Sequence, residues 1–187
     1  MDNVIAIFTG RDLEEMREIG GSGYWVANAD NVRNMKYALL VRNDNESLSP
    51  NDGIEHGQAF MIGKVSGCVA SKRYPTRKLI QISEYSLLKN ENNFKESWKK
   101  LTSKKNTNRG QRYPISYIDT DDLLNKIELD VESLDWIPFE VSPTVEEAVE
   151  TEDNERNNLP EIVAEAKEMI AEAAGVDIDQ VEIHIRF

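Results

Sequence analysis

The sequence has few of the residues that build metal and nucleophile sites. Its 187 residues include one cysteine, Cys68, and two histidines, His56 and His184. A lone cysteine excludes an intrachain disulfide and a thiolate metal site, and its strand-like surroundings favour a small buried side chain. The two histidines lie far apart and show no metal-ligand spacing. We therefore predict no metal, no cofactor and no catalysis by the chain alone.

Membrane-spanning and secretory features are also missing. No apolar run approaches the length that crosses a bilayer. The first residues, MDNVIAIFTG, carry an acid where a secretory signal needs positive charge. We expect a soluble, cytoplasmic protein that does not contact a membrane.

Positive charge is scarce in the last third of the chain. Residues 1–118 contain 18 Lys and Arg against 13 Asp and Glu, whereas residues 119–187 contain 4 against 21. The net charges of the two parts are +5 and −17, which give −12 for the whole chain. A mildly basic body with an acidic tail is typical of a protein whose basic part faces nucleic acid or another acidic partner.

Apolar segments alternate with short helical patterns over residues 1–141, which we predict to form one domain. Strands are predicted at residues 3–10, 24–28, 36–43, 58–71, 79–88 and 112–118, and short helices at 11–20, 29–35, 93–101 and 119–127. Asp30 is the expected cap of the second helix. Because nothing recurs with βαβ regularity, the prediction is an α+β fold, with a curled mixed sheet or small β-barrel flanked by short helices.

The acidic end of the chain divides into a linker and an appendage. Residues 142–158 lack aromatic side chains and are rich in acids, which predicts a linker. Residues 159–187 show an apolar stripe at helical spacing and then the alternating segment QVEIHIRF, so we predict an amphipathic helix and a strand. An isolated strand must pair with a sheet edge, so this appendage is a candidate docking or homodimer element.

One stretch is strongly basic. Residues 95–114, KESWKKLTSKKNTNRGQRYP, carry seven basic side chains and one acid. A helix here would place Lys95 and Lys99 on one face, with Trp98 anchoring it beside Phe94 and Leu101. The predicted phosphate-binding residues are Lys95, Lys99, Lys100, Lys104, Lys105, Arg109 and Arg112. Two alternatives remain open, namely a solvated lysine-rich helix and a dock for the acidic linker 142–158.

A second candidate site is the short segment around Trp25. Its indole beside Asn28 and Asn31 offers a stacking surface and polar groups for the edge of a base. The alternative is that Trp25 is a core residue of a strand, because large aromatic side chains dominate cores.

The order of features in residues 4–122 resembles the PUA-like superfamily, in particular its YTH and EVE branches. The resemblance rests on VIAIFTGRDLEEMREIGGSGYWVANADNVRNM, KYALLVRN, QAFMIGKVSG and NTNRGQRYPISYIDTDDL. It implies a small curled sheet or barrel with an aromatic pocket for a flipped, often methylated, base. Trp25 stands where the family has its first cage tryptophan, Asn28 and Asn31 where polar edge contacts lie, and Tyr74 near the second aromatic wall.

The leading interpretation is therefore a module that binds RNA or DNA, with a base in the pocket and phosphates along residues 95–112. The first alternative is a protein-interaction or dimerisation module that acts through residues 159–187. The second comes from the ASCH branch, which resembles nucleoside amidohydrolases that use a lysine and a glutamate. GKVSG supplies Gly63 and Lys64 but lacks the acid and arginine that follow in that motif.

Overall fold

The larger part of the chain is built around one mixed β-sheet. Most of its strands are formed by the apolar runs predicted from the sequence. The computed structural model describes residues 3–46, 49–89, 91–102 and 114–142, together with residues 163, 166–167, 170–171 and 180–184. The chain divides into two compact units, Met1–Val145 and Glu146–Phe187.

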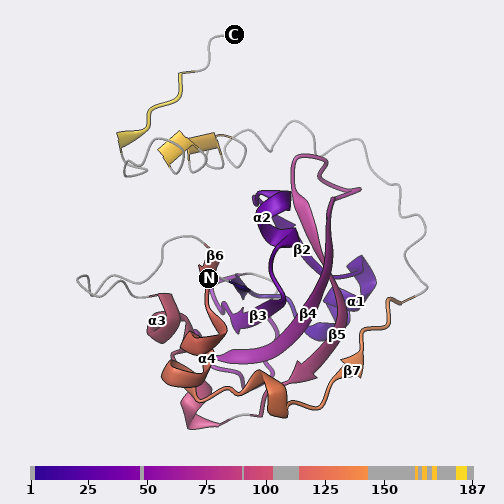
Figure 1. Ribbon diagram of the computed structural model, residues 1–187. Helices are drawn as coiled ribbons and strands as arrows, with labels where there is room; N and C mark the ends of the chain where they lie inside the picture. Colours follow the sequence, from indigo (N-terminus) through magenta and orange to yellow (C-terminus); the bar gives the residue numbers. More distant parts are fainter. Residues whose placement is uncertain are drawn as a thin grey trace. The chain divides into compact units, whose positions relative to one another are not determined.

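The sheet of the larger unit has the strand order β2-β5-β4-β3-β1-β6, with β7 paired to β5 beside this path. Its strands are β1 (Val4–Thr9), β2 (Ser22–Trp25), β3 (Tyr37–Arg42), β4 (Ala59–Ala70), β5 (Lys78–Leu87), β6 (Ile115–Ile118) and β7 (Ile137–Pro138). Among the strands of the described residues, β1 and β3 alone pair in parallel, and the other pairs are antiparallel. The sheet is strongly curled into a half-barrel (Figure 1), so the predicted α+β class is confirmed.

Strand β4 is the longest strand, and irregularities bend it. Its register against β5 shifts between Lys64 and Val65 and again between Val65 and Gly67. Gly63 permits close packing, since a Cβ atom there would stand 2.7 Å from a methyl carbon of Ile82. Bulges increase the local twist and curl of a sheet. These register shifts beside Gly63 and Gly67 account for the bend in β4.

Short helices cover the sheet: α1 (Leu13–Ile19), α2 (Ala29–Arg33), α3 (Ser97–Thr102) and α4 (Thr120–Ile127), with 3-10 turns η1 (Asn92–Phe94) and η2 (Val131–Ser133). Local signals set the ends of α1. Asp12 and Glu15 form a reciprocal capping box at its start, and Gly20 ends it with φ of 81°. The predicted helix 11–20 is confirmed, with its boundaries at the cap residues.

The core lies on both faces of the central strands. Ile5 and Ile7 of β1 pack in one cluster, and Val4 and Ala6 pack in the other. Alternate side chains of a strand point to opposite faces, so a strand buried on both faces is apolar at nearly every position. This explains why the central strands were the easiest elements to predict.

The basic helix predicted at 93–101 is interrupted. After η1, Lys95 is extended, with φ of −64° and ψ of 144°, and Glu96 has φ of 54° before α3 begins at Ser97. Lys95 and Lys99 therefore do not share a helix face, contrary to the prediction. Phe94, Trp98 and Leu101 are nevertheless buried in one cluster, as expected of an anchor.

The smaller unit is described at few residues. Residues 163, 166–167 and 170–171 are helical, with Ala171 buried and Ile170 48% exposed. Val181–His184 form no strand, so the predicted strand is wrong over its described part. A strand needs hydrogen-bonding neighbours, which sequence alternation does not supply. Within the described residues, no helix is both long and apolar enough to span a bilayer.

Candidate nucleic-acid interface

Trp25 is a core residue. Its side chain is 7% exposed, lies in the same cluster as Ile80 and Cys68, and donates its indole N–H to the Ser22 hydroxyl at 3.0 Å. A ring that stacks on a base needs an accessible face. The predicted base-pocket role of Trp25 is therefore wrong in this structure, and its alternative role in the core holds.

Asn28 and Asn31 belong to the start of α2. The Asn28 carboxamide oxygen accepts the backbone N–H groups of Asp30 at 2.9 Å and Asn31 at 3.2 Å. Asn28, rather than Asp30, is thus the N-cap, because its side chain satisfies the first free amides of the helix. Its acceptor is already used, so the predicted contact of Asn28 with a base edge is replaced by a capping role. Asn31 is exposed in the first turn.

Tyr74 packs against Tyr24, a contact that the sequence analysis did not predict. Its ring lies edge-on to Tyr24, with ring centroids 5.0 Å apart and an interplanar angle of 72°. Both tyrosines are partly exposed. The missed signal was strand alternation: where Trp25 faces the core, its neighbour Tyr24 faces outward. The structure therefore pairs Tyr74 with Tyr24 instead of Trp25.

Basic groups surround these two rings. The Arg11 guanidinium lies 5.2 Å from the Tyr24 centroid and donates to the Gly23 carbonyl at 2.6 Å. Arg73 lies 5.5 Å from the Tyr74 centroid, and Arg77 donates to the Tyr24 carbonyl at 3.2 Å. With the neighbouring lysines of the β4–β5 turn, they form what we call the hairpin cluster: Arg11, Tyr24, Lys72, Arg73, Tyr74, Arg77 and Lys78.

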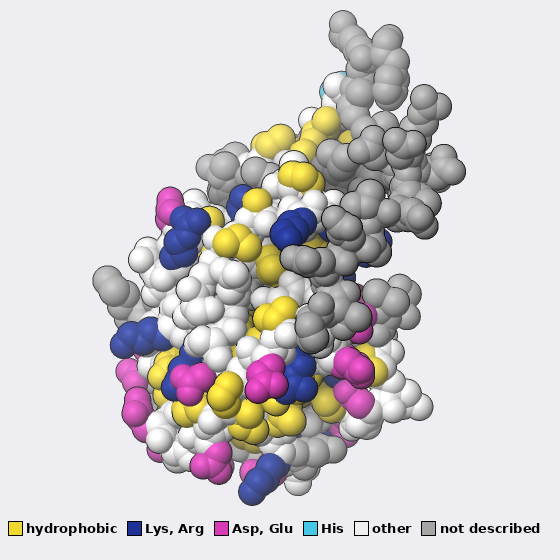
Figure 2. Space-filling view, turned by 90° about the vertical axis from the view of Figure 1, so that its right-hand side faces the viewer, with side chains coloured by type: hydrophobic (Ala, Val, Ile, Leu, Met, Phe, Trp, Pro, Cys, Tyr) yellow, Lys and Arg dark blue, Asp and Glu magenta, His cyan; other side chains and the backbone are white. Residues whose placement is uncertain are grey.

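The hairpin cluster is positively charged. Residues 65–83 contain no Asp or Glu. Within the described parts of the chain, Lys72, Arg73 and Lys78 form no ion pair with a carboxylate. In Figure 2, Lys and Arg side chains lie in both the upper and the lower part of the view, whereas most of the visible Asp and Glu side chains lie in the lower part. Cations beside partly exposed aromatic rings are the chemistry of a nucleic-acid surface.

The predicted phosphate strip differs from this cluster. Lys95 pairs with Glu55 at 2.6 Å, Lys99 pairs with Glu96 at 3.5 Å, and Lys100 donates to the Asn93 carbonyl at 2.9 Å. We call these three residues the α3 lysines, although Lys95 lies two residues before α3 begins. Each already has a partner, which lowers its attraction for a phosphate. The other predicted members, Lys104, Lys105, Arg109 and Arg112, lie outside the described residues.

The hydrolase alternative gains a carboxylate, but that carboxylate forms an ion pair with the lysine. Lys64 pairs across the sheet with Glu84 at 2.7 Å, so β5 supplies the acid that GKVSG lacks. The Lys64 ammonium lies 4.6 Å from the centroid of the Trp136 ring, and Trp136 also stacks on Tyr37. These contacts attach the segment before β7 to the sheet. Among the described residues, no cluster of His, Cys, Asp or Glu is placed to hold a metal ion.

Cys68 is buried in the core under the hairpin cluster. Its side chain is 1% exposed, which confirms the prediction of a small buried residue. Burial raises the pKa of the Cys68 thiol, and the nearby positive charges of Arg33 and Lys78 oppose that rise. A thiol kept protonated and out of solvent has a packing role.

No protein-family model, curated protein or solved structure matches this chain.

Proposed function

We propose that this protein is a PUA-like module that binds single-stranded RNA or DNA through the hairpin cluster. The observation that supports the proposal is the contact between Tyr24 and Tyr74, with a guanidinium beside each ring. Bases of a single strand stack on tyrosine rings, and the surrounding cations neutralise the phosphates between those bases. A duplex keeps its bases stacked inside, so the tyrosines favour the single strand.

The cluster is fastened to rigid elements, which suits recognition. Tyr24 belongs to β2, and Arg77 ties the β4–β5 turn to it through the Tyr24 carbonyl. Within the turn, the Arg77 amide donates to the Tyr74 carbonyl, and the Tyr74 amide donates to the Ser71 hydroxyl. A surface whose side chains are held before binding loses less conformational entropy when the ligand arrives.

Substitution of Tyr74 tests the proposal. Stacking of one base contributes ~1–3 kcal/mol, so Tyr74→Ala should weaken the binding of a fluorescent single strand by about 5- to 150-fold. Tyr74→Phe keeps the ring and should bind within about twofold of the wild type. Anisotropy titrations at low salt measure both, and thermal unfolding checks that the variants fold. Failure of the wild-type chain to bind any single strand would contradict the proposal.

A second role, self-association through residues 159–187, is favoured by the exposure of Ile170. This apolar side chain of the described helix is 48% exposed in its unit, whereas the adjacent Ala171 is buried. Ile170→Glu should then shift a dimer to a monomer in light scattering after size exclusion. A wild-type chain that is monomeric at high concentration would rule this role out.

A further inference from the structure

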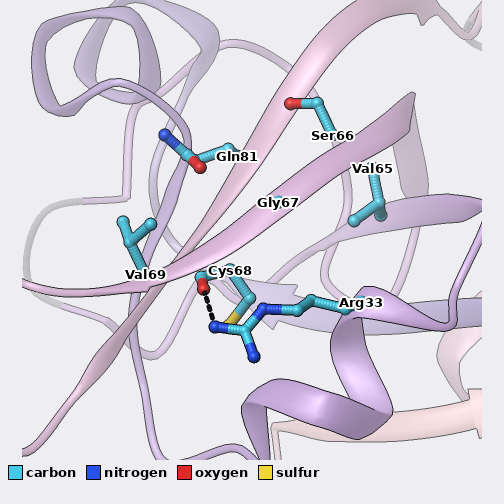
Figure 3. Close-up of a pocket in the computed structure, with 7 residues that line it drawn as sticks. All are labelled: Arg33, Val65, Ser66, Gly67, Cys68, Val69 and Gln81. Atoms are coloured by element: carbon cyan, nitrogen blue, oxygen red, sulfur yellow. Dashed lines mark hydrogen bonds between the residues drawn. The ribbon is translucent and has the colours of Figure 1, made fainter.

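A pocket opens where β4 extends beyond β3. The two strands pair from Tyr37 opposite Lys64 onward, so the last part of β4, from Val65 to Ala70, has β5 on one side and α2 on the other. The pocket has a volume of about 440 Å³ and is lined by Arg33, Val65, Ser66, Gly67, Cys68, Val69 and Gln81 (Figure 3). Ala70 follows Val69 and pairs with Lys78, so the pocket borders the hairpin cluster.

Gly67 and Gln81 lie side by side in the pocket lining and supply an available amide. The two residues lie opposite each other on β4 and β5, and a Cβ atom on Gly67 would stand 2.5 Å from the Gln81 carboxamide oxygen. Glycine therefore leaves the space that this side chain uses. The Gln81 carboxamide forms no hydrogen bond with any other described residue. Glycine within a strand often marks a place where a ligand approaches the backbone closely.

Arg33 and Val69 form two other sides of the pocket. The Arg33 guanidinium is held by Asp30 at 2.9 Å and by the Cys68 carbonyl at 3.1 Å, the bond drawn in Figure 3. Those bonds use two of its five N–H donors, which leaves donors for sugar or phosphate oxygens. Val69 is 41% exposed and supplies an apolar wall. An open pocket of this volume has room for one base, and its lining combines polar groups with an apolar wall.

We propose that this pocket receives one base of the bound strand and prefers adenine, an inference that rests on the proposed function. A glutamine carboxamide places an acceptor beside donors, and this pair matches the N6 and N7 edge of adenine. Single-stranded bases expose that edge, so a protein can read it. The tyrosines of the hairpin cluster stack on any base, whereas Gln81 distinguishes adenine from the other bases.

Two homopolymers test this assignment. Wild-type protein should bind an oligoadenylate of about ten nucleotides more tightly than an oligouridylate, by about 5-fold or more. Gln81→Ala should bring the ratio of the two dissociation constants to about one, with the larger loss on oligoadenylate. Gly67→Ala should act in the same direction because it displaces the Gln81 side chain. Ser83→Ala, an exposed position on the same strand, is the matched control and should keep the wild-type ratio.

The outcomes separate this inference from the proposed function. Equal binding of both homopolymers, unchanged in Gln81→Ala, would overturn the pocket assignment while the hairpin cluster stands. Absence of binding to any oligonucleotide would overturn the proposed function. In that case the pocket assignment is tested with adenosine monophosphate alone, whose binding is measured by ligand-observed NMR. A binding signal that the wild type shows and Gln81→Ala loses would support the assignment. No binding signal in the wild type would overturn it.

Discussion

The hairpin cluster and the α3 lysines are two groups of basic side chains with different neighbours. Lys95 and Lys99 are paired with carboxylates, one of which, Glu55, is distant in the sequence. Lys72 and Arg73 are exposed and have no such partner among the described residues, and Arg73 lies beside the ring of Tyr74. The density of lysines in a sequence therefore does not measure free positive charge on the surface. Partners brought by the fold decide which cations remain available.

The two groups share one feature: each has a neighbouring tryptophan whose side chain is buried in the core. Trp25 and Trp98 are each 7% exposed, one in each core cluster. Trp98 anchors α3, which carries Lys99 and Lys100, whereas Trp25 belongs to β2, which carries Tyr24 of the hairpin cluster. In both cases the ligand surface is left to other side chains.

The largest expected effect is on stability. Trp25→Ala and Trp98→Ala should each lower the free energy of unfolding by ~3–5 kcal/mol, because each removes a large buried ring. Urea denaturation followed by circular dichroism measures this loss. A Trp25→Ala variant that kept wild-type stability and lost only base binding would restore the base-pocket role that the sequence predicted for Trp25.

Charge reversal separates the two groups directly. Lys72→Glu combined with Arg73→Glu should weaken single-strand binding roughly tenfold or more and reduce the slope of log K against log salt by about 1.4, for two lost phosphate contacts. The matched control is Lys95→Glu with Lys99→Glu, which changes the net charge equally and should have a much smaller effect. Equal losses in both variants would mean that only net charge matters and would remove the distinction.

Removal of the carboxylates that pair with Lys95 and Lys99 should make the two groups of basic side chains more alike in their attraction for phosphates. Glu55→Gln with Glu96→Gln removes the carboxylates that pair with Lys95 and Lys99. Affinity for any single strand should rise roughly two- to threefold at low salt, and the gain should disappear as salt screens exposed charges. The cost in folding stability should be ~0–1 kcal/mol per pair. A sequence-selective gain would contradict a purely electrostatic origin.

The smallest effect concerns the thiol under the hairpin cluster. Burial raises the pKa of Cys68 in the folded state, so the unfolded chain loses this proton first as the pH rises. The free energy of unfolding should therefore decline above the ordinary thiol pKa of about 8.5, and the decline should be shallower in Cys68→Ala. Denaturation curves between neutral and alkaline pH measure the difference. Parallel pH profiles of the two proteins would show that the thiol is not desolvated.

Much of the fold could be predicted because its signals are local. The apolar runs of β1 and β3 reflect burial on both faces, and Asp12 and Gly20 mark the ends of α1. The basic helix was predicted too long, since Phe94, Trp98 and Leu101 keep helical spacing across an extended residue and a positive φ at Glu96. Spacing alone does not reveal such a break when the same cluster buries all three side chains.

The candidate site was predicted less well because its members come from separate strands. Tyr74 was predicted as an aromatic wall, but its neighbour Tyr24 and the guanidinium of Arg11 are brought to it by the pairing of β2 with β5. Asn28 was assigned to a base because the sequence did not show that its side chain caps α2. These contacts depend on register and on competing local hydrogen bonds.

The sequence by itself determined the charge division, the α+β class and most strands and helices of the larger unit, because periodicity and composition act along the chain. The tertiary structure alone decided that Trp25 faces the core and that the α3 lysines are paired. It also placed the Gln81 side chain against Gly67, with no hydrogen-bond partner among the described residues. Burial and electrostatic pairing depend on distances in space, and strand register sets those distances only after the sheet has formed.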